Sequence, residues 1–165
     1  MLTRCIAIAL ACCFAIPAAA SAAPPVPVLD PEELALCRQI NDYRAQRGVA
    51  PLRVSAARTR AASWHSSDMA RHDYFDHTDS RGRSFSMRTR AFRLAGASHA
   101  ENIAAGASSA AGTLEQWRNS PGHRRNMLSA RYKVVGIGRA RNAASTFGWY
   151  WTTTFGAIRD RTIPC

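Results

Sequence analysis

Residues 117–128, with the sequence WRNSPGHRRNML, are the most informative stretch of this chain. A helix that ends at Asn119 would meet Ser120 as the cap of a second helix, and Pro121 would take the first helical position, where no N–H is needed. His123 then falls in the first turn of that second helix. The stretch therefore predicts two short consecutive helices with an imidazole close to their junction.

Two strands are expected after this stretch. Residues 134–140 form an apolar run, and residues 148–155 alternate so that one face carries Trp149, Trp151, Thr153 and Phe155. Residues 142–145 have the composition of the turn between the strands. An antiparallel hairpin is therefore predicted at the end of the chain.

Helices are expected before it. Asp30, Pro31 and Glu33 have the spacing of a capping box at a helix start, and Gly48 is a suitable stop. The remaining expectations are a helix over 55–72, a polar turn over 74–82, a short helix over 85–92, a loop over 104–112 and a helix over 114–119. Helices first and a hairpin last predict an α+β fold in which helices pack on a small sheet.

The first 22 residues have the anatomy of a secretory signal peptide: a positive start, an apolar run over 5–16 and the small-residue site Ala20-Ser21-Ala22. A lipoprotein signal with Cys12 or Cys13 as the lipidated residue is the alternative. We expect a signal peptide over 1–22, an extended lead-in over 23–30 and one domain over 31–165. The chain would be secreted or periplasmic, without a transmembrane segment after signal removal.

Cysteine usage agrees with export. Removal of the signal peptide leaves Cys37 and Cys165. Two cysteines in an exported chain favour one disulfide, and two free thiols are the alternative.

The formal net charge is +11, and Lys133 is the only lysine. A basic exported protein is drawn to anionic partners, such as a cell-envelope polymer or lipid head groups. Nucleic acid is not expected, because no nucleic-acid-binding motif accompanies the charge. The densest basic stretch, Arg81, Arg83, Arg88, Arg90 and Arg93, is interpreted as a solvated face.

Common catalytic motifs are absent: the sequence contains no HExxH, GxSxG, Walker loop or CxxC pair. The residues that could carry chemistry are dispersed: His77, Glu101, Glu115, Ser120 and His123. Composition alone does not join them, since a lone histidine more often packs or donates a hydrogen bond than binds a ligand.

Seven pieces in a fixed order do join them: INDYRAQRG (40–48) with Leu52 after it, AASWHSSDMA (61–70), YFDHT (74–78), ENIAAG (101–106), WRNSPGHRRNML (117–128), VGIG (135–138) and YWTTTFG (150–156). This series resembles a bacterial member of the CAP superfamily, the SCP-like domain of cysteine-rich secretory proteins, antigen 5 and pathogenesis-related protein 1. The resemblance implies a three-layer α-β-α sandwich with a short antiparallel sheet.

The resemblance also implies a site. Family members line a cleft with two histidines and two glutamates, and the histidines bind a divalent metal, often Zn²⁺. His77 and His123 match the histidines, and Glu101 matches the first glutamate, although Ala100 precedes it where the family has glycine. Ser120 stands in the place of the second glutamate. Glu115 does not match that place, because it lies before the family tryptophan instead of after it.

Several functions are compatible with that resemblance. The first is a non-enzymatic extracellular binding module that uses the cleft of His77, Glu101, Ser120 and His123. The second is a metal-dependent hydrolase acting on peptide or envelope polymer, with Glu101 as catalytic base beside zinc on His77 and His123. Glu101 could instead orient a histidine from behind. A lipid or sterol carrier and a purely structural envelope protein are the remaining alternatives.

Other residues are interpreted as structural. His65 is expected to be buried and hydrogen-bonded, and Asn41 and Arg44 resemble a family framework pair that bonds neighbouring loops. The tryptophans are expected in the core: Trp64, Trp117, Trp149 and Trp151.

Overall fold

The computed structural model describes residues 28–158 and 161–165, so the predicted signal peptide and the first part of the lead-in lie outside the described residues. The chain runs through α1 (Pro31–Ala45), β1 (Arg53–Ser55), α2 (Ala56–His72), α3 (Phe85–Ala91), β2 (His99–Ala105), α4 (Ala110–Asn119), α5 (Pro121–Leu128), β3 (Val134–Arg141), β4 (Trp149–Gly156) and β5 (Thr162–Ile163). None of the helices described is long and apolar enough to cross a membrane.

A five-stranded sheet with the order β2-β4-β3-β1-β5 forms the middle layer. The predicted β3–β4 hairpin is present, with Ile137 opposite Thr153. The sheet is not wholly antiparallel as expected, because β1 runs parallel to β3. A parallel pair needs a long crossover, and the chain between β1 and β3 supplies one that includes α2 and β2.

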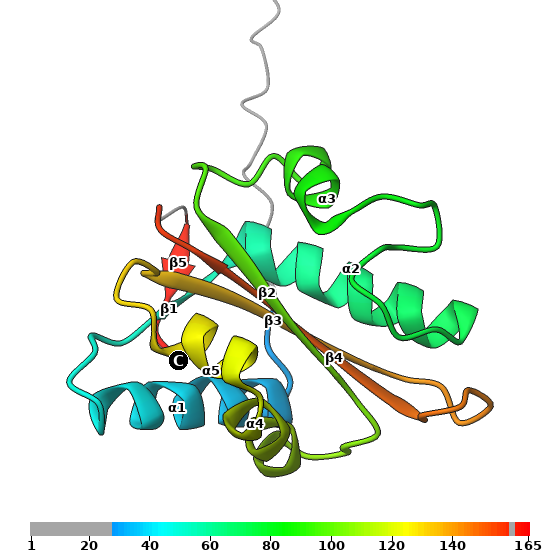
Figure 1. Ribbon diagram of the computed structural model, residues 1–165, viewed down its shortest axis with the longest axis horizontal. Coiled ribbons are helices and arrows are strands. Elements are labelled where there is room, and N and C mark those ends of the chain that lie inside the picture. Colours follow the sequence, from blue (N-terminus) through cyan, green and yellow to red (C-terminus); the bar gives the residue numbers. More distant parts are fainter. Residues whose placement is uncertain (1–27, 159–160) are drawn as a thin grey trace, which may run out of the picture.

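Helices cover both faces of this sheet and confirm the predicted α-β-α sandwich. Figure 1 shows α2 along one face and α1, α4 and α5 together on the other. The larger core cluster lies on the α1 side and includes Trp117, Trp151 and Phe155. A smaller cluster on the α2 side joins Met69 to Tyr150. Successive residues of β4 thus face opposite layers, and the strand is buried on both sides.

The start of α1 forms as its sequence predicts. The Asp30 carboxylate accepts hydrogen bonds from the backbone of Glu32 and Glu33, and the Glu33 side chain accepts from the Asp30 N–H. The helix ends at Ala45, before the predicted stop, and the chain turns through Gly48 with φ at 67°. A capping box replaces missing helical bonds and holds the entry angle of the chain.

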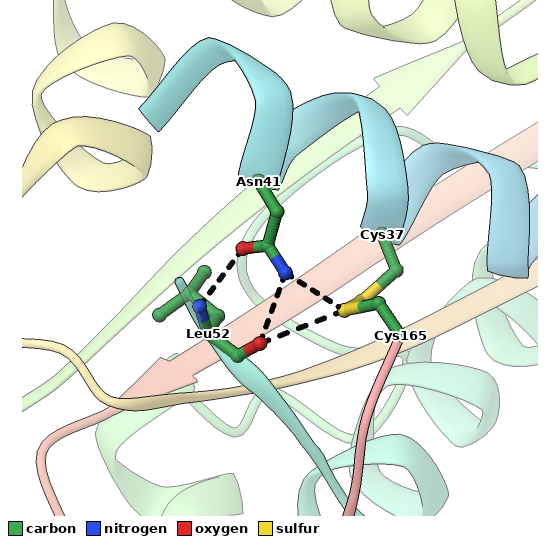
Figure 2. The surroundings of a disulfide bond; sticks show 4 residues. All are labelled: Cys37, Asn41, Leu52 and Cys165. Carbon is green, nitrogen blue, oxygen red and sulfur yellow. Dashed lines mark hydrogen bonds between the residues drawn. A yellow bond between two sulfur atoms is a disulfide. The ribbon is translucent and has the colours of Figure 1, made fainter. Parts of the chain in front are cut away.

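The predicted Cys37–Cys165 disulfide is present and joins α1 to the end of the chain (Figure 2). It closes a sequence separation of 128 residues, for which loop-closure entropy gives about 5 kcal/mol of stabilisation. Beside it, the Asn41 side-chain amide bonds both the N–H and the carbonyl of Leu52 (Figure 2). Asn41 therefore fixes the loop after α1, as expected of a framework residue.

Arg44 completes that framework from inside the protein. Its guanidinium is fully buried and donates to the backbone carbonyls of Ala50, Met127, Ser129 and Tyr132. These carbonyls belong to the loop after α1, to the last turn of α5 and to the segment that leads from α5 into β3. The expected role of Arg44 is thus confirmed.

The predicted loop over 104–112 is wrong at both ends. Ala104 and Ala105 belong to β2, where they pair with Trp151 and Tyr150 of β4. The small side chains suit positions beside large aromatic residues, which is a tertiary preference and not a local one. At the other end α4 already begins at Ala110, capped by the Ser109 side chain.

Two further expectations hold only in part. Ser120 stands at the junction of α4 and α5, as the cap of both, yet its side chain forms no capping hydrogen bond. Of the tryptophans expected in the core, Trp117 and Trp151 are fully buried, whereas Trp64 and Trp149 are half-buried beneath arginine side chains.

Helix α2 lies directly on the backbone of β3. A Cβ atom at Gly136 would overlap the backbone of Arg58 and Thr59, and one at Gly138 would overlap that of Ser63. These glycines let a helix and a strand approach more closely than any side chain permits. The contact is sealed by Ser66, whose hydroxyl donates to the Gly138 carbonyl at 2.8 Å.

Replacement of Gly138 by alanine is expected to lower the free energy of unfolding by about 3 kcal/mol, because the new methyl group meets backbone instead of a movable side chain. Chemical denaturation monitored by circular dichroism measures the change. Gly122→Ala is the matched control, since its Cβ would meet only the end of the Arg125 side chain, at 4.0 Å. An equal loss in both variants would contradict the close-packing argument.

Candidate functional site

His77 and Glu101 meet although they come from different elements. His77 lies in the segment between α2 and α3, and Glu101 lies on β2. The His77 Nδ1 atom is 2.9 Å from Glu101 Oε1. Because a carboxylate only accepts, Nδ1 carries the proton and Nε2 keeps its lone pair when the ring is neutral. The His77 side chain is 51% exposed while that of Glu101 is 3% exposed, so the carboxylate supports the imidazole from inside.

Arg88 of α3 holds that carboxylate. Its Nη2 donates to both oxygens of Glu101, at 2.6 and 2.7 Å, and its Nη1 donates to the backbone carbonyl of His77. Arg88 is 3% exposed, so the prediction of a solvated basic face over 81–93 is wrong at this residue. Arg83 of the same stretch pairs with Asp79 at 2.7 Å. Arg88 thus fixes both the loop that carries His77 and the carboxylate that orients it.

The segment with His77 is also tied down to α2. The His65 Nε2 atom donates to the Asp76 carbonyl at 3.1 Å, which assigns its proton because a carbonyl only accepts. The Asp68 carboxylate accepts from the Tyr74 hydroxyl at 2.6 Å and from the backbone N–H of Ser80 at 2.9 Å. Both ends of the 74–80 segment are therefore bonded to one helix. His65 is buried and hydrogen-bonded, as predicted.

Burial lowers the pKa of His65 to about 4, although the Glu101 carboxylate nearby, at 4.0 Å, opposes part of the shift. Desolvation disfavours the imidazolium, and the Arg88 charge adds to that effect. His65 is therefore neutral at physiological pH, and it serves as a hydrogen-bond donor beneath the segment that carries His77.

His123 reaches the same strand from the other side. Its backbone carbonyl accepts from the Asn102 side chain at 3.2 Å, and Asn126 of α5 donates to the carbonyl of Glu101 at 3.3 Å. The His123 ring lies edge-on to Trp117, with centroids 6.3 Å apart. Burial, with the charge of His77 as a second cause, lowers the pKa of His123. His123 is thus attached to β2 beside Glu101, the residue whose carboxylate contacts His77.

The structure brings some of the predicted site residues into contact and leaves others apart. Glu101 contacts His77 directly, and the helix that carries His123 is bonded to the β2 backbone at Glu101. Ser120 is half-buried at the α4–α5 junction. Glu115 is exposed on α4 and accepts a hydrogen bond from Asn119, in a local contact outside this arrangement. We call His77, Glu101, Ser120 and His123 the imidazole site.

The fit of this site to zinc is partial. His77 Nε2 and the His123 ring are nitrogen ligands of the right kind. Glu101 does not fit as a third ligand, because Arg88 engages both of its oxygens and His77 Nδ1 shares one. Within residues 28–158 and 161–165, no group of three or more His, Cys, Asp or Glu side chains is arranged to hold a metal ion. Zinc binding stays a prediction that rests on two histidines.

Arg88→Met is expected to cost about 3–5 kcal/mol of stability, because it leaves the Glu101 carboxylate buried without its cation. Glu101→Gln in the same background should restore much of that loss, since the buried charge is then gone. Urea denaturation of the two single variants and the double variant measures the coupling. Additive losses would show that the ion pair does not govern stability here.

His65 should make stability depend on pH. Because its folded pKa, about 4, lies below the ordinary value of 6.5, the unfolded chain binds the proton first as the pH falls. The free energy of unfolding should therefore drop by about 3 kcal/mol between pH 6.5 and pH 4. In His65→Gln this contribution should be missing from a denaturation series across that range. An unchanged pH profile would contradict the assignment.

Comparison with known proteins gives this arrangement a family. The family model described as "Cysteine-rich secretory protein family" (CAP) matches residues 37–155. The chain is 31% identical over 116 residues to the uncharacterized protein YkwD of Bacillus subtilis (strain 168), a match that covers 70% of this chain and 43% of that protein. It therefore spans less than half the length of that relative.

Solved structures agree. An extracellular protein containing a SCP domain from Bacillus anthracis str. Ames has a TM-score of 0.62 at 26% identity, over 78% of this chain and 44% of that one. An outer surface protein from Borrelia burgdorferi has a TM-score of 0.68 at 17% identity, over 76% of this chain and 91% of that one, and shares the fold. The family model, the relative and the α-β-α sandwich agree: the chain belongs to the cysteine-rich secretory protein (CAP) family.

Proposed function

We propose that this chain is an extracellular or periplasmic binding module whose imidazole site holds its ligand. The observation that carries the proposal is the chain of contacts from Arg88 through Glu101 to His77. The buried Arg88–Glu101 ion pair lies behind the exposed His77 imidazole and fixes the orientation of that ring. Such support from behind is typical of functional histidines.

The environment suits an exported protein. The Cys37–Cys165 disulfide is of the kind that persists in oxidising compartments. The predicted signal peptide over 1–22 points the same way, as does the extracellular SCP-domain protein to which the chain is similar. These observations support an extracellular or periplasmic location.

The imidazole site offers two kinds of ligand group. His77 Nε2, with its lone pair, can accept a hydrogen bond from a ligand or bind a cation. Burial lowers the pKa of His123 and so favours its neutral form, which also suits a nitrogen donor. Glu101 acts here as the positioning group for His77. The hydrolase alternative would need this carboxylate as a base, and the hydrogen bonds from Arg88 hold it back from that role.

Zinc serves as the first probe of the imidazole site. Isothermal titration should show one weak zinc site in the mature protein, since only two nitrogen ligands are firm, and no site in His77→Ala/His123→Ala. His72→Ala is the control, because His72 is an exposed histidine on α2 outside the imidazole site. Equal zinc binding in all three proteins would remove the metal from the proposal.

The same samples separate binding from catalysis. Peptide and cell-wall libraries incubated with and without a chelator should show no metal-sensitive turnover. Turnover that the chelator abolishes and that His77→Ala/His123→Ala lacks would replace the binding module with a hydrolase. Titration with lipid and sterol dispersions then distinguishes a carrier, which binds them, from a module for other ligands.

A further inference from the structure

A second polar surface lies on the outward face of α2. A hollow of about 90 Å³ is lined by Ser67, Arg71, His72, Ser80 and Arg81, among others. A second hollow of about 290 Å³ is lined by Ser67, Arg71 and Arg141, with neighbouring residues of β3. Ser67 and Arg71 belong to both, so the two hollows adjoin. We call the combined surface the arginine trough.

The trough runs across two elements that the fold holds together. Helix α2 supplies Ser67 and Arg71, and the end of β3 supplies Arg141. The Asn142 side chain donates to the Ala70 carbonyl at 2.7 Å and ties the hairpin to the helix. Figure 1 shows the C-terminal end of α2 and the turn of the β3–β4 hairpin on the same side of the molecule. Arg71 and Arg141 are therefore held on one frame. Arg81 lies in the segment after α2, where the neighbouring Ser80 is bonded to Asp68 of α2.

The trough carries a net positive charge, because three arginines outnumber the one carboxylate in its lining, that of Asp68. Arg71, Arg81 and Arg141 are exposed, and among the described residues none of their guanidinium groups forms an ion pair. The acid in its lining, Asp68, is buried and accepts from Tyr74 and from the Ser80 hydroxyl at 2.7 Å. Burial raises the pKa of Asp68, but these hydrogen bonds outweigh that effect and keep the pKa low.

The shape and lining favour a polymer over a membrane. A bilayer-binding surface presents apolar side chains that enter the lipid. In the trough the one large apolar ring is Trp64, and the Arg83 guanidinium covers it at 4.9 Å from the centroid. Most of the other polar groups are guanidiniums, an imidazole, an amide and hydroxyls, which bind phosphate or sulfate oxygens well. The one carboxylate, Asp68, is buried. Two adjoining hollows with arginines in both suit charges repeated along a chain.

We propose that the arginine trough binds a linear polyanion carrying phosphate or sulfate groups along its length. Arg81, Arg71 and Arg141 contact successive anionic groups, and the Ser67 hydroxyl donates between them. The trough is built from other residues than the imidazole site, so the chain has two binding surfaces. The polymer retains the protein at an anionic matrix while the imidazole site remains free.

The test compares two triple variants with the same change in net charge. Arg71→Gln/Arg81→Gln/Arg141→Gln removes the trough cations. Arg47→Gln/Arg125→Gln/Arg131→Gln removes three exposed arginines from the turn after α1, from α5 and from the segment after α5, on the other side of the sheet. Binding to long-chain polyphosphate and to fluorescein-labelled dextran sulfate is measured at 50, 100 and 200 mM salt. Neutral dextran is the blank, and thermal unfolding confirms that each variant is folded.

The trough variant should lose about tenfold or more in affinity and show a shallower dependence on salt, because fewer counterions are released. The control variant should stay within about threefold of the wild type. Equal losses in both variants, or no loss in either, would overturn the proposal. Binding to phosphatidylglycerol vesicles without binding to either polymer would also overturn it, in favour of a membrane surface.

A third comparison separates this proposal from the proposed function. His77→Ala/His123→Ala should bind polyphosphate like the wild type, because its trough is intact. The trough variant should in turn keep the zinc response of the wild type. Loss of polyphosphate binding in the histidine variant would place the polyanion at the imidazole site and refute a separate trough.

Discussion

The structure depends on the direct seating of α2 on the backbone of β3. Gly136 and Gly138 make that seat possible because a side chain at either position would strike the helix. Once α2 is seated, His65 and Asp68 point at the following segment and bond it. That segment carries His77. The position of the exposed His77 ring therefore depends on two glycines of β3, because they let α2 approach the sheet.

Buried polar side chains fix the positions of several loops in this fold. Arg44 replaces water for four backbone carbonyls, and Arg88 neutralises Glu101 in the interior. Such groups contribute little net stability, yet their removal is costly because the partner stays buried and unsatisfied. Their effect is specificity of position. Arg44 holds the loop after α1 against the segment between α5 and β3, and Arg88 holds the segment with His77 against β2.

The sequence predicted those elements whose start or turn is set by neighbouring residues. The capping box at Asp30 and the turn after Arg141 both form from residues close in sequence. Strand β2 was missed because its alanines have no strand preference of their own. They become strand only through pairing with Trp151 and Tyr150 of β4. The parallel pairing of β1 with β3 was missed because a strand of three residues is too short to show an alternating pattern.

By itself the sequence determined the family resemblance, because seven motifs stand in a fixed order, and that resemblance implied the layered fold and named His77, Glu101 and His123 as candidate site residues. The Cys37–Cys165 pair was predicted from the two cysteines that remain after the expected signal peptide. Only the tertiary structure decided what holds the Glu101 carboxylate, because Arg88 belongs to a basic stretch whose local pattern resembles a solvated surface. Its burial against Glu101 is a contact between α3 and β2. Long-range pairing of charges has no local sequence signal, since it depends on which surfaces the fold brings together.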